Sequence, residues 1–203
     1  MKYLLLTFLF ATMLKPVLAD SPLTSTSFSD AYADNAMVIK AGENGGLLND
    51  ELMAYLADNN HPIDVKMALI NKLSWDFNGK TNAATFFNYL KQKNKYKSEK
   101  DFKKKAKADE LLCYAYLKAL DNYFDVKEAV VYADLATKKN KTSYTFQIIA
   151  ALIKAQAAFD TDWCKVFQTT NEVRNNTLLR ADMKSTAIDI IFEYMDLYAD
   201  SCA

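Results

Sequence analysis

The chain has 203 residues, enough for one domain with a substantial core, and its 25 basic residues balance its 25 acidic residues. A chain near neutrality lacks the general attraction to nucleic acid that a basic surface provides. Among the basic residues only Arg174 and Arg180 are arginine, the side chain best suited to phosphate groups, so we expect no nucleic-acid partner.

The first nineteen residues have the pattern of an export signal. Lys2 supplies a positive start, residues 3–14 form an apolar run, and residues 17–19 resemble a signal-peptidase site. A lysine and a proline interrupt the run, which disfavours a membrane anchor. We predict a signal peptide at 1–19 and a single domain at 20–203 that is exported, periplasmic or secreted, and without a membrane-spanning segment. The excess of lysine over arginine indicates an AT-rich, bacterial genome.

Apolar residues at helical spacing predict four helices in the first half of the domain. A polar tail at 23–27 is expected to precede the first helix, over 29–40. Asn49 and Asn82 can cap the second and fourth helices, and Pro62 suits the first turn of the third.

Glycine and proline are absent from residues 80–203. The third helix precedes this region, and its apolar pattern extends to Phe77, just before Gly79. Because glycine and proline punctuate turns and end strands, their absence favours helices joined by short polar turns.

Capping side chains mark five further helix starts. The first of these helices is expected to reach about residue 124. The capping residues are Ser98, Asp125 with Glu128 as a capping box, Thr142, Asp160 or Thr161, and Thr177.

The most apolar stretch is residues 143–159, which contain one charged residue, Lys154. A helix that is apolar nearly all round is contacted on several sides, so we predict that this is the central core helix. The predicted fold is all-α, with about nine helices in antiparallel hairpins. Either a short α-solenoid-like repeat or an irregular helical bundle fits this pattern.

The second half shows a weak internal repeat, because Asn-Lys-Thr at 140–142 recurs as Asn-Asn-Thr at 175–177, 35 residues later. A period near 35 residues with two helices per unit is typical of helical-hairpin repeats. Residues 111–139 resemble a tetratricopeptide-like unit, and the resemblance extends over about 111–200. The glycine and proline typical of that family are missing. The resemblance implies a short solenoid.

Three cysteines follow the predicted signal peptide, and export makes disulfides available to them. An odd number leaves at least one thiol free or paired with another chain. Cys113 lies in an apolar helical run and is expected to be a buried hydrophobic residue. If a pair forms, Cys164 with Cys202 is the favoured choice, because the C-terminal tail can bend back.

Most catalytic and metal sites require residue types that are scarce here. His61 is the only histidine, precedes a proline at a predicted turn and is interpreted as an exposed structural residue. The sequence has no glycine-rich phosphate loop, no haem-attachment motif and no serine-nucleophile motif. We therefore predict no catalytic residue, no metal and no cofactor.

Paired carboxylates are the one catalytic chemistry left open. Solvated helix surface is nevertheless the expected place for each candidate. The candidates are Glu51, Glu110, Glu172 and Glu193.

Residues 91–107 carry nine lysines. Lys91, Lys93, Lys95 and Lys97 could contact an acidic partner or anionic lipid, but we favour a solvated helix end and turn. An acidic stripe is expected on the last helix, which would give the domain two ends of different charge that could orient a partner. The stripe consists of Asp182, Asp189, Glu193, Asp196 and Asp200.

These features favour an exported, non-catalytic helical module that binds a protein partner through a groove lined by tyrosine and phenylalanine. One version is a periplasmic immunity- or inhibitor-type protein that caps an exported toxin or cell-wall enzyme. The alternative is a small carboxylate-dependent hydrolase that acts on the cell envelope. A buried, close pair of acids in a cleft would favour the hydrolase, and a wide concave face without perturbed acids would favour the binding module.

Overall fold

The structure is a computed structural model that describes residues 20–202. The predicted signal peptide at 1–19 lies outside the described residues. The described part is all-helical, as predicted, with ten α-helices, two 3₁₀ helices and no strand. None of these helices has both the length and the apolar character needed to cross a bilayer. In chain order the elements are η1 (Phe28–Tyr32), α1 (Ala36–Glu43), α2 (Asp50–Ala57), α3 (Ile63–Leu73), α4 (Asn82–Asn94), α5 (Glu99–Lys105), α6 (Ala108–Asp121), α7 (Lys127–Lys139), α8 (Tyr144–Ala158), α9 (Trp163–Arg174), α10 (Ser185–Met195) and η2 (Asp196–Cys202).

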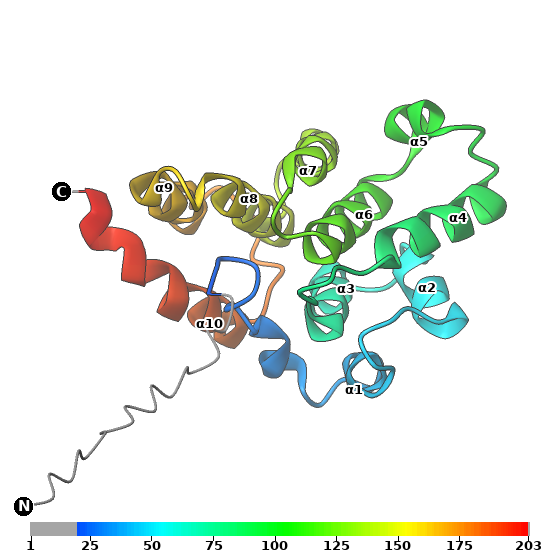
Figure 1. The fold of residues 1–203 in the computed structure, drawn as a ribbon, viewed down its shortest axis with the longest axis horizontal. Coiled ribbons are helices and arrows are strands. Elements are labelled where there is room, and N and C mark those ends of the chain that lie inside the picture. The colour runs from blue at the N-terminus through cyan, green and yellow to red at the C-terminus, as the bar shows by residue number, and fades with distance from the viewer. Residues whose placement is uncertain (1–19, 203) are drawn as a thin grey trace, which may run out of the picture.

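The helices form two layers (Figure 1). In one layer α6 packs on α7, α7 on α8, and α8 on α9. In the other, α3 packs on α1 and η1, and α10 packs on η1. The layers meet where α3 contacts α6 and α8. The first and last parts of the chain also meet, since the backbone N–H of Lys184 donates to the Tyr32 hydroxyl at 3.1 Å.

Helix α8 is the central helix, which confirms the prediction for 143–159. Ile148, Ile149 and Leu152 are completely buried. Ser143, rather than Thr142, caps the helix, because its Oγ accepts a hydrogen bond from the N–H of Phe146 at 3.2 Å.

The segment before η1 is not the polar tail that we expected. Leu23 and Thr26 are buried. The N–H of Leu23 donates to Oε1 of Gln156 on α8 at 3.4 Å, and Thr26 Oγ1 donates to the carbonyl of Pro22 at 2.7 Å. One local hydrogen bond and one to α8 satisfy polar groups of the segment, so it can enter the core.

Two predicted helices are each divided in the structure. The helix expected at 29–40 becomes η1 and α1, because the Asn35 side chain caps a new start at α1. The helix expected from Ser98 to about 124 becomes α5 and α6. There the backbone N–H of Lys107 donates to Oε2 of Glu110 at 2.8 Å, which starts α6 afresh.

The last helix begins later than predicted. Thr177 does not cap it, and residues 175–184 instead run beside the start of α8. Two backbone hydrogen bonds link Arg180 to residues 142–144. Asp182, predicted to lie in the acidic stripe, is half-buried and accepts a hydrogen bond from the N–H of Thr145 at 2.9 Å. These long-range hydrogen bonds replace those of a helix.

Two more helix starts differ slightly from the prediction. Asp162, rather than Asp160 or Thr161, caps α9. Asp125 precedes the N-cap of α7 and forms no capping box.

The spacing of the later helices bears on the repeat. α6 and α8 begin 36 residues apart, and so do α7 and α9, whereas α10 begins 41 residues after α8. The regular spacing covers two hairpins, and the tetratricopeptide-like resemblance stays a prediction.

Candidate functional site

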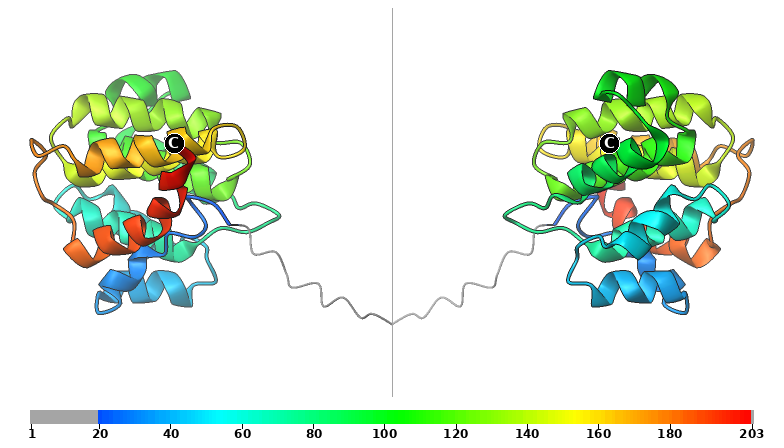
Figure 2. Two further views of the ribbon diagram at one scale, coloured as in Figure 1. Left: turned by 90° about the vertical axis from the view of Figure 1, so that its left-hand side faces the viewer. Right: turned by 90° about the vertical axis from the view of Figure 1, so that its right-hand side faces the viewer.

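Helix α3 ends before its apolar pattern does, and the chain then forms a loop that projects from the body (Figure 2). Ser74 takes a positive φ of 59°, which stops the helix after Leu73. Lys80 Nζ donates to the carbonyls of Leu73 and Ser74 at 2.6 and 3.1 Å, so it satisfies the helix end. Gly79 has a φ of 79°, and a Cβ there would lie 2.9 Å from the Asp121 carbonyl. The loop is therefore fixed at both ends.

An aromatic cluster, here named the aromatic tip, joins this loop to the turn after α6. It consists of Trp75, Phe77, Tyr123 and Phe124. The rings of Phe77 and Phe124 meet edge to face with centroids 5.7 Å apart, and Trp75 meets Tyr123 in the same way at 5.1 Å. Phe77 is 71% exposed and Phe124 67%. Single exposed apolar residues are ordinary, but two in contact form a patch of the kind that marks binding surfaces.

A groove of about 470 Å³, here named the α6–α8 groove, opens beside the aromatic tip. Its walls are the turn between α6 and α7, the end of α8 and the first described residues. Phe124 lies on one wall and Phe159 on the other. Tyr198 of η2 packs edge to face on Phe159, with centroids 5.9 Å apart, and so supports the far wall.

The charged groups of the groove are mainly acidic. Asp20, Asp125 and Asp160 line it, against one cationic side chain, Lys127. The carboxyl end of α8 and the amino end of α7 also line the groove, and their partial charges are of opposite sign. The Tyr123 hydroxyl is buried in the wall and has no hydrogen-bond partner among the described residues.

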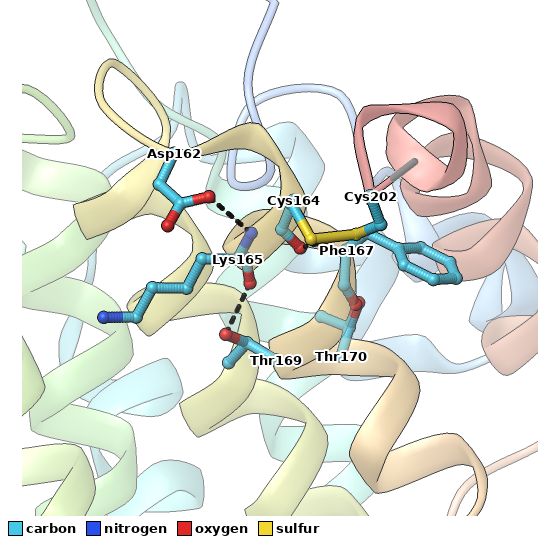
Figure 3. The surroundings of a disulfide bond; sticks show 7 residues. All are labelled: Asp162, Cys164, Lys165, Phe167, Thr169, Thr170 and Cys202. Carbon is cyan, nitrogen blue, oxygen red and sulfur yellow. Dashed lines mark hydrogen bonds between the residues drawn. A yellow bond between two sulfur atoms is a disulfide. The ribbon is translucent and has the colours of Figure 1, made fainter.

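Cys164 and Cys202 are joined by a disulfide, with Cα atoms 4.6 Å apart (Figure 3). The bond ties η2 to the start of α9. Because Tyr198 of η2 packs on Phe159, the disulfide also restrains the far wall of the groove. Cys113 is completely buried, and burial raises the pKa of its thiol to about 12.

The four lysines of the basic run lie outside this groove. Lys91 and Lys93 are at the end of α4, and Lys95 and Lys97 are in the following turn, at the end of the molecule opposite the C-terminus (Figure 1). All four are exposed, and none forms an ion pair with a described carboxylate. The structure does not bring them together with the aromatic tip.

Glu110 is not on solvated surface as expected, whereas the other three candidate glutamates are exposed. Glu110 is 1% exposed. Its carboxylate accepts hydrogen bonds from the Tyr96 hydroxyl at 2.7 Å, the Asn94 amide at 2.5 Å and the backbone N–H of Lys107 at 2.8 Å. The division of the predicted long helix at Lys107 turns this side chain inward.

Asp121 is a second buried acid and lines a separate cavity of about 610 Å³ between α4, α6 and α7. Its Oδ2 accepts a hydrogen bond from the N–H of Ala83 at 2.7 Å, so it caps α4 from another helix. Its Oδ1 has no partner among the described residues. Burial raises the pKa of this carboxyl group.

His61 is half-buried rather than exposed, and its ring stacks on Tyr55 with centroids 3.9 Å apart. Within residues 20–202, no group of three or more histidine, cysteine or acidic side chains could hold a metal ion.

No protein-family model, curated protein or solved structure matches the chain. The function is therefore inferred from the residues themselves.

Proposed function

We propose that the protein is an exported, non-catalytic module that binds another protein through the aromatic tip and the α6–α8 groove. The observation that carries this proposal is the pair of contacting, largely exposed rings of Phe77 and Phe124 at the edge of a groove. Aromatic residues are enriched at interfaces because they bury a large area with little loss of conformational freedom. Burying one phenylalanine side chain contributes about 1.5–3 kcal/mol.

Contacts within the protein hold the aromatic tip in place, which supports the same proposal. The Lys80 ammonium group and the close approach of Gly79 to Asp121 hold the loop, and Trp75 packs on Tyr123 behind the exposed rings. A surface that is already ordered avoids part of the entropic cost of association.

The buried acids also favour a binding role over catalysis. Glu110, Asp121 and Asp182 each accept a hydrogen bond from a backbone N–H and thereby fix a helix start. One form of the proposal is an immunity- or inhibitor-type protein that occludes an exported toxin or cell-wall enzyme, since such a role needs a docking surface and no catalytic group.

Capture of partners from the native periplasm tests the proposal. Phe77→Ser with Phe124→Ser should abolish capture of a partner that the parent protein retains, with little change in melting temperature. Leu178→Ser is the matched control, because Leu178 is 88% exposed and lies outside the groove. Equal capture by the parent and the double variant would contradict the proposal.

One observation favours the alternative, a carboxylate-dependent hydrolase of the cell envelope. Asp121 has a raised pKa and borders a cavity, as a general acid requires. Asp121→Asn keeps an oxygen acceptor for Ala83, so the fold should persist. Loss of a measured envelope-hydrolysing activity in this variant would support the hydrolase, and absence of such activity in the parent would dismiss it.

A further inference from the structure

The α6–α8 groove combines apolar walls with an acidic rim, and this combination restricts what it can bind. Its volume of about 470 Å³ lies within the range of sites that enclose a small ligand or a large side chain. Phe124, after α6, and Phe159, at the end of α8, supply apolar surface to the groove. An occupant must therefore present a large apolar group to the groove.

The charges at the rim of the groove determine which charge the occupant should carry beside that apolar group. Asp20, Asp125 and Asp160 line the groove together with one cationic side chain, Lys127. If the chain is cleaved before Asp20, its new α-ammonium group adds a positive charge. The groove then has three anionic and two cationic groups. Phosphate groups and acidic peptides are repelled, and lysine or arginine is attracted.

We propose that the groove binds a segment of the partner protein in which a large apolar side chain is flanked by lysine or arginine. The apolar side chain lies between Phe124 and Phe159, and the cationic groups lie beside Asp125 and Asp160. This inference rests on the proposed function, because it names the chemistry of the segment that the docking surface accepts.

Titration of the isotope-labelled protein, residues 20–203, with three short acetylated peptides tests this inference. The first has a phenylalanine between two lysines, the second has glutamates in place of the lysines, and the third has glycine in place of the phenylalanine. NMR shifts report both the affinity and the place of binding. The first peptide should shift the amides of Asp125 and Asp160 and bind at least about tenfold more tightly than the other two.

The charge variant is Asp125→Asn with Asp160→Asn, which keeps the shape of both side chains. It should weaken binding of the first peptide by about tenfold at low salt. Its affinity should approach that of the parent as the Debye length falls from about 8 Å at 0.15 M salt to about 3 Å at 1 M. Melting temperatures of parent and variant should agree, since both aspartates are on the surface of the groove.

The outcomes separate this inference from the proposed function. Equal binding of the lysine and glutamate peptides, shifts outside the groove or no binding of the lysine peptide would overturn the inference. If partner capture still depends on Phe77 and Phe124 in that case, the docking surface stands and only its cationic specificity fails. If capture does not depend on these rings, the proposed function fails as well.

Discussion

Buried acidic side chains start helices and hold them together in this protein. Glu110, Asp121 and Asp182 each accept a backbone N–H, and two of these hydrogen bonds join different helices or segments. A hydrogen bond to a charged acceptor is stronger than one between neutral groups, and a buried acid without donors would be costly. These residues help to define helix boundaries, a role that glycine and proline have in many other proteins.

Glu110 gives the sharpest test at the residue scale. Glu110→Ala leaves the Tyr96 hydroxyl, the Asn94 amide and the Lys107 N–H without their acceptor, at a cost of about 1–3 kcal/mol for each donor that stays buried. Denaturant unfolding should show the loss. The exposed Glu193→Ala is the control and should change the free energy of unfolding by less than about 0.5 kcal/mol. Equal stabilities of the two variants would contradict this role of Glu110.

At the scale of elements, segments without helical hydrogen bonds of their own bind to helix ends. Residues 175–184 follow the start of α8, and Asp182 is their main polar contact with Thr145. Burial alone would raise the pKa of Asp182, but hydrogen bonds from Ser143, Thr145 and Arg180 outweigh burial and hold it below its usual value of 3.8.

This lowered pKa predicts an acid-sensitive contribution to stability. The unfolded state takes up a proton at Asp182 at higher pH than the folded state does, so the contribution is complete above about pH 4 and is lost as the pH falls through the folded pKa. Urea unfolding at several pH values should show that Asp182→Asn is less stable than the parent at neutral pH, with the gap narrowing below about pH 4. A gap that is independent of pH would show that the charge of Asp182 does not matter.

The disulfide between Cys164 and Cys202 closes a loop with a sequence separation of 38 residues. Replacing both cysteines by serine should lower the free energy of unfolding by about 2–4 kcal/mol, because the unfolded chain regains freedom. A thiol reductant should destabilise the parent and leave the variant unchanged. If the reductant destabilises both proteins equally, the bond is not the cause.

The helical elements were predictable because apolar spacing near 3.6 residues dominates the chain, and α8 was identified from its lack of charge. The late start of the last helix was not predictable, because the residues before it bond to partners distant in sequence, such as Asp182 with Thr145. The two divided helices were missed because their local caps, Asn35 and Glu110, lie inside a continuous helical pattern. The aromatic tip was missed because a single turn brings its rings together. Phe77 continues the apolar stripe of α3, and only the turn at Ser74 moves its ring out to meet Phe124. In the sequence, the position of Phe77 two residues before Gly79 was a local indication of a loop.

For the molecule as a whole, charge is distributed unevenly along the long axis. The unpaired lysines of the basic run lie at the α4–α5 end, and Asp189, Glu193 and Asp200 are exposed near the C-terminus (Figure 1). Such a distribution can orient a partner during encounter without forming the contact surface.

Replacing Lys91, Lys93, Lys95 and Lys97 by glutamine tests whether the basic run does more than this. Because all four are exposed and without ion pairs to described carboxylates, stability should change by less than about 0.5 kcal/mol for each substitution. Equilibrium binding to a captured partner should stay nearly unchanged in surface plasmon resonance. A large, salt-dependent fall in the association rate with unaltered melting would instead make the basic run a docking site.

The central claim is that the aromatic tip and the groove form a protein-docking surface. A photo-crosslinking amino acid placed at Phe124 and, in a matched protein, at Leu178 tests it in intact cells that produce the protein. Both positions are largely exposed, but only Phe124 lines the groove. We predict a discrete protein adduct at Phe124 that is absent at Leu178 and is suppressed by Phe77→Ser. Equal adducts at both positions, or none at Phe124 while the protein still captures a partner, would contradict the claim.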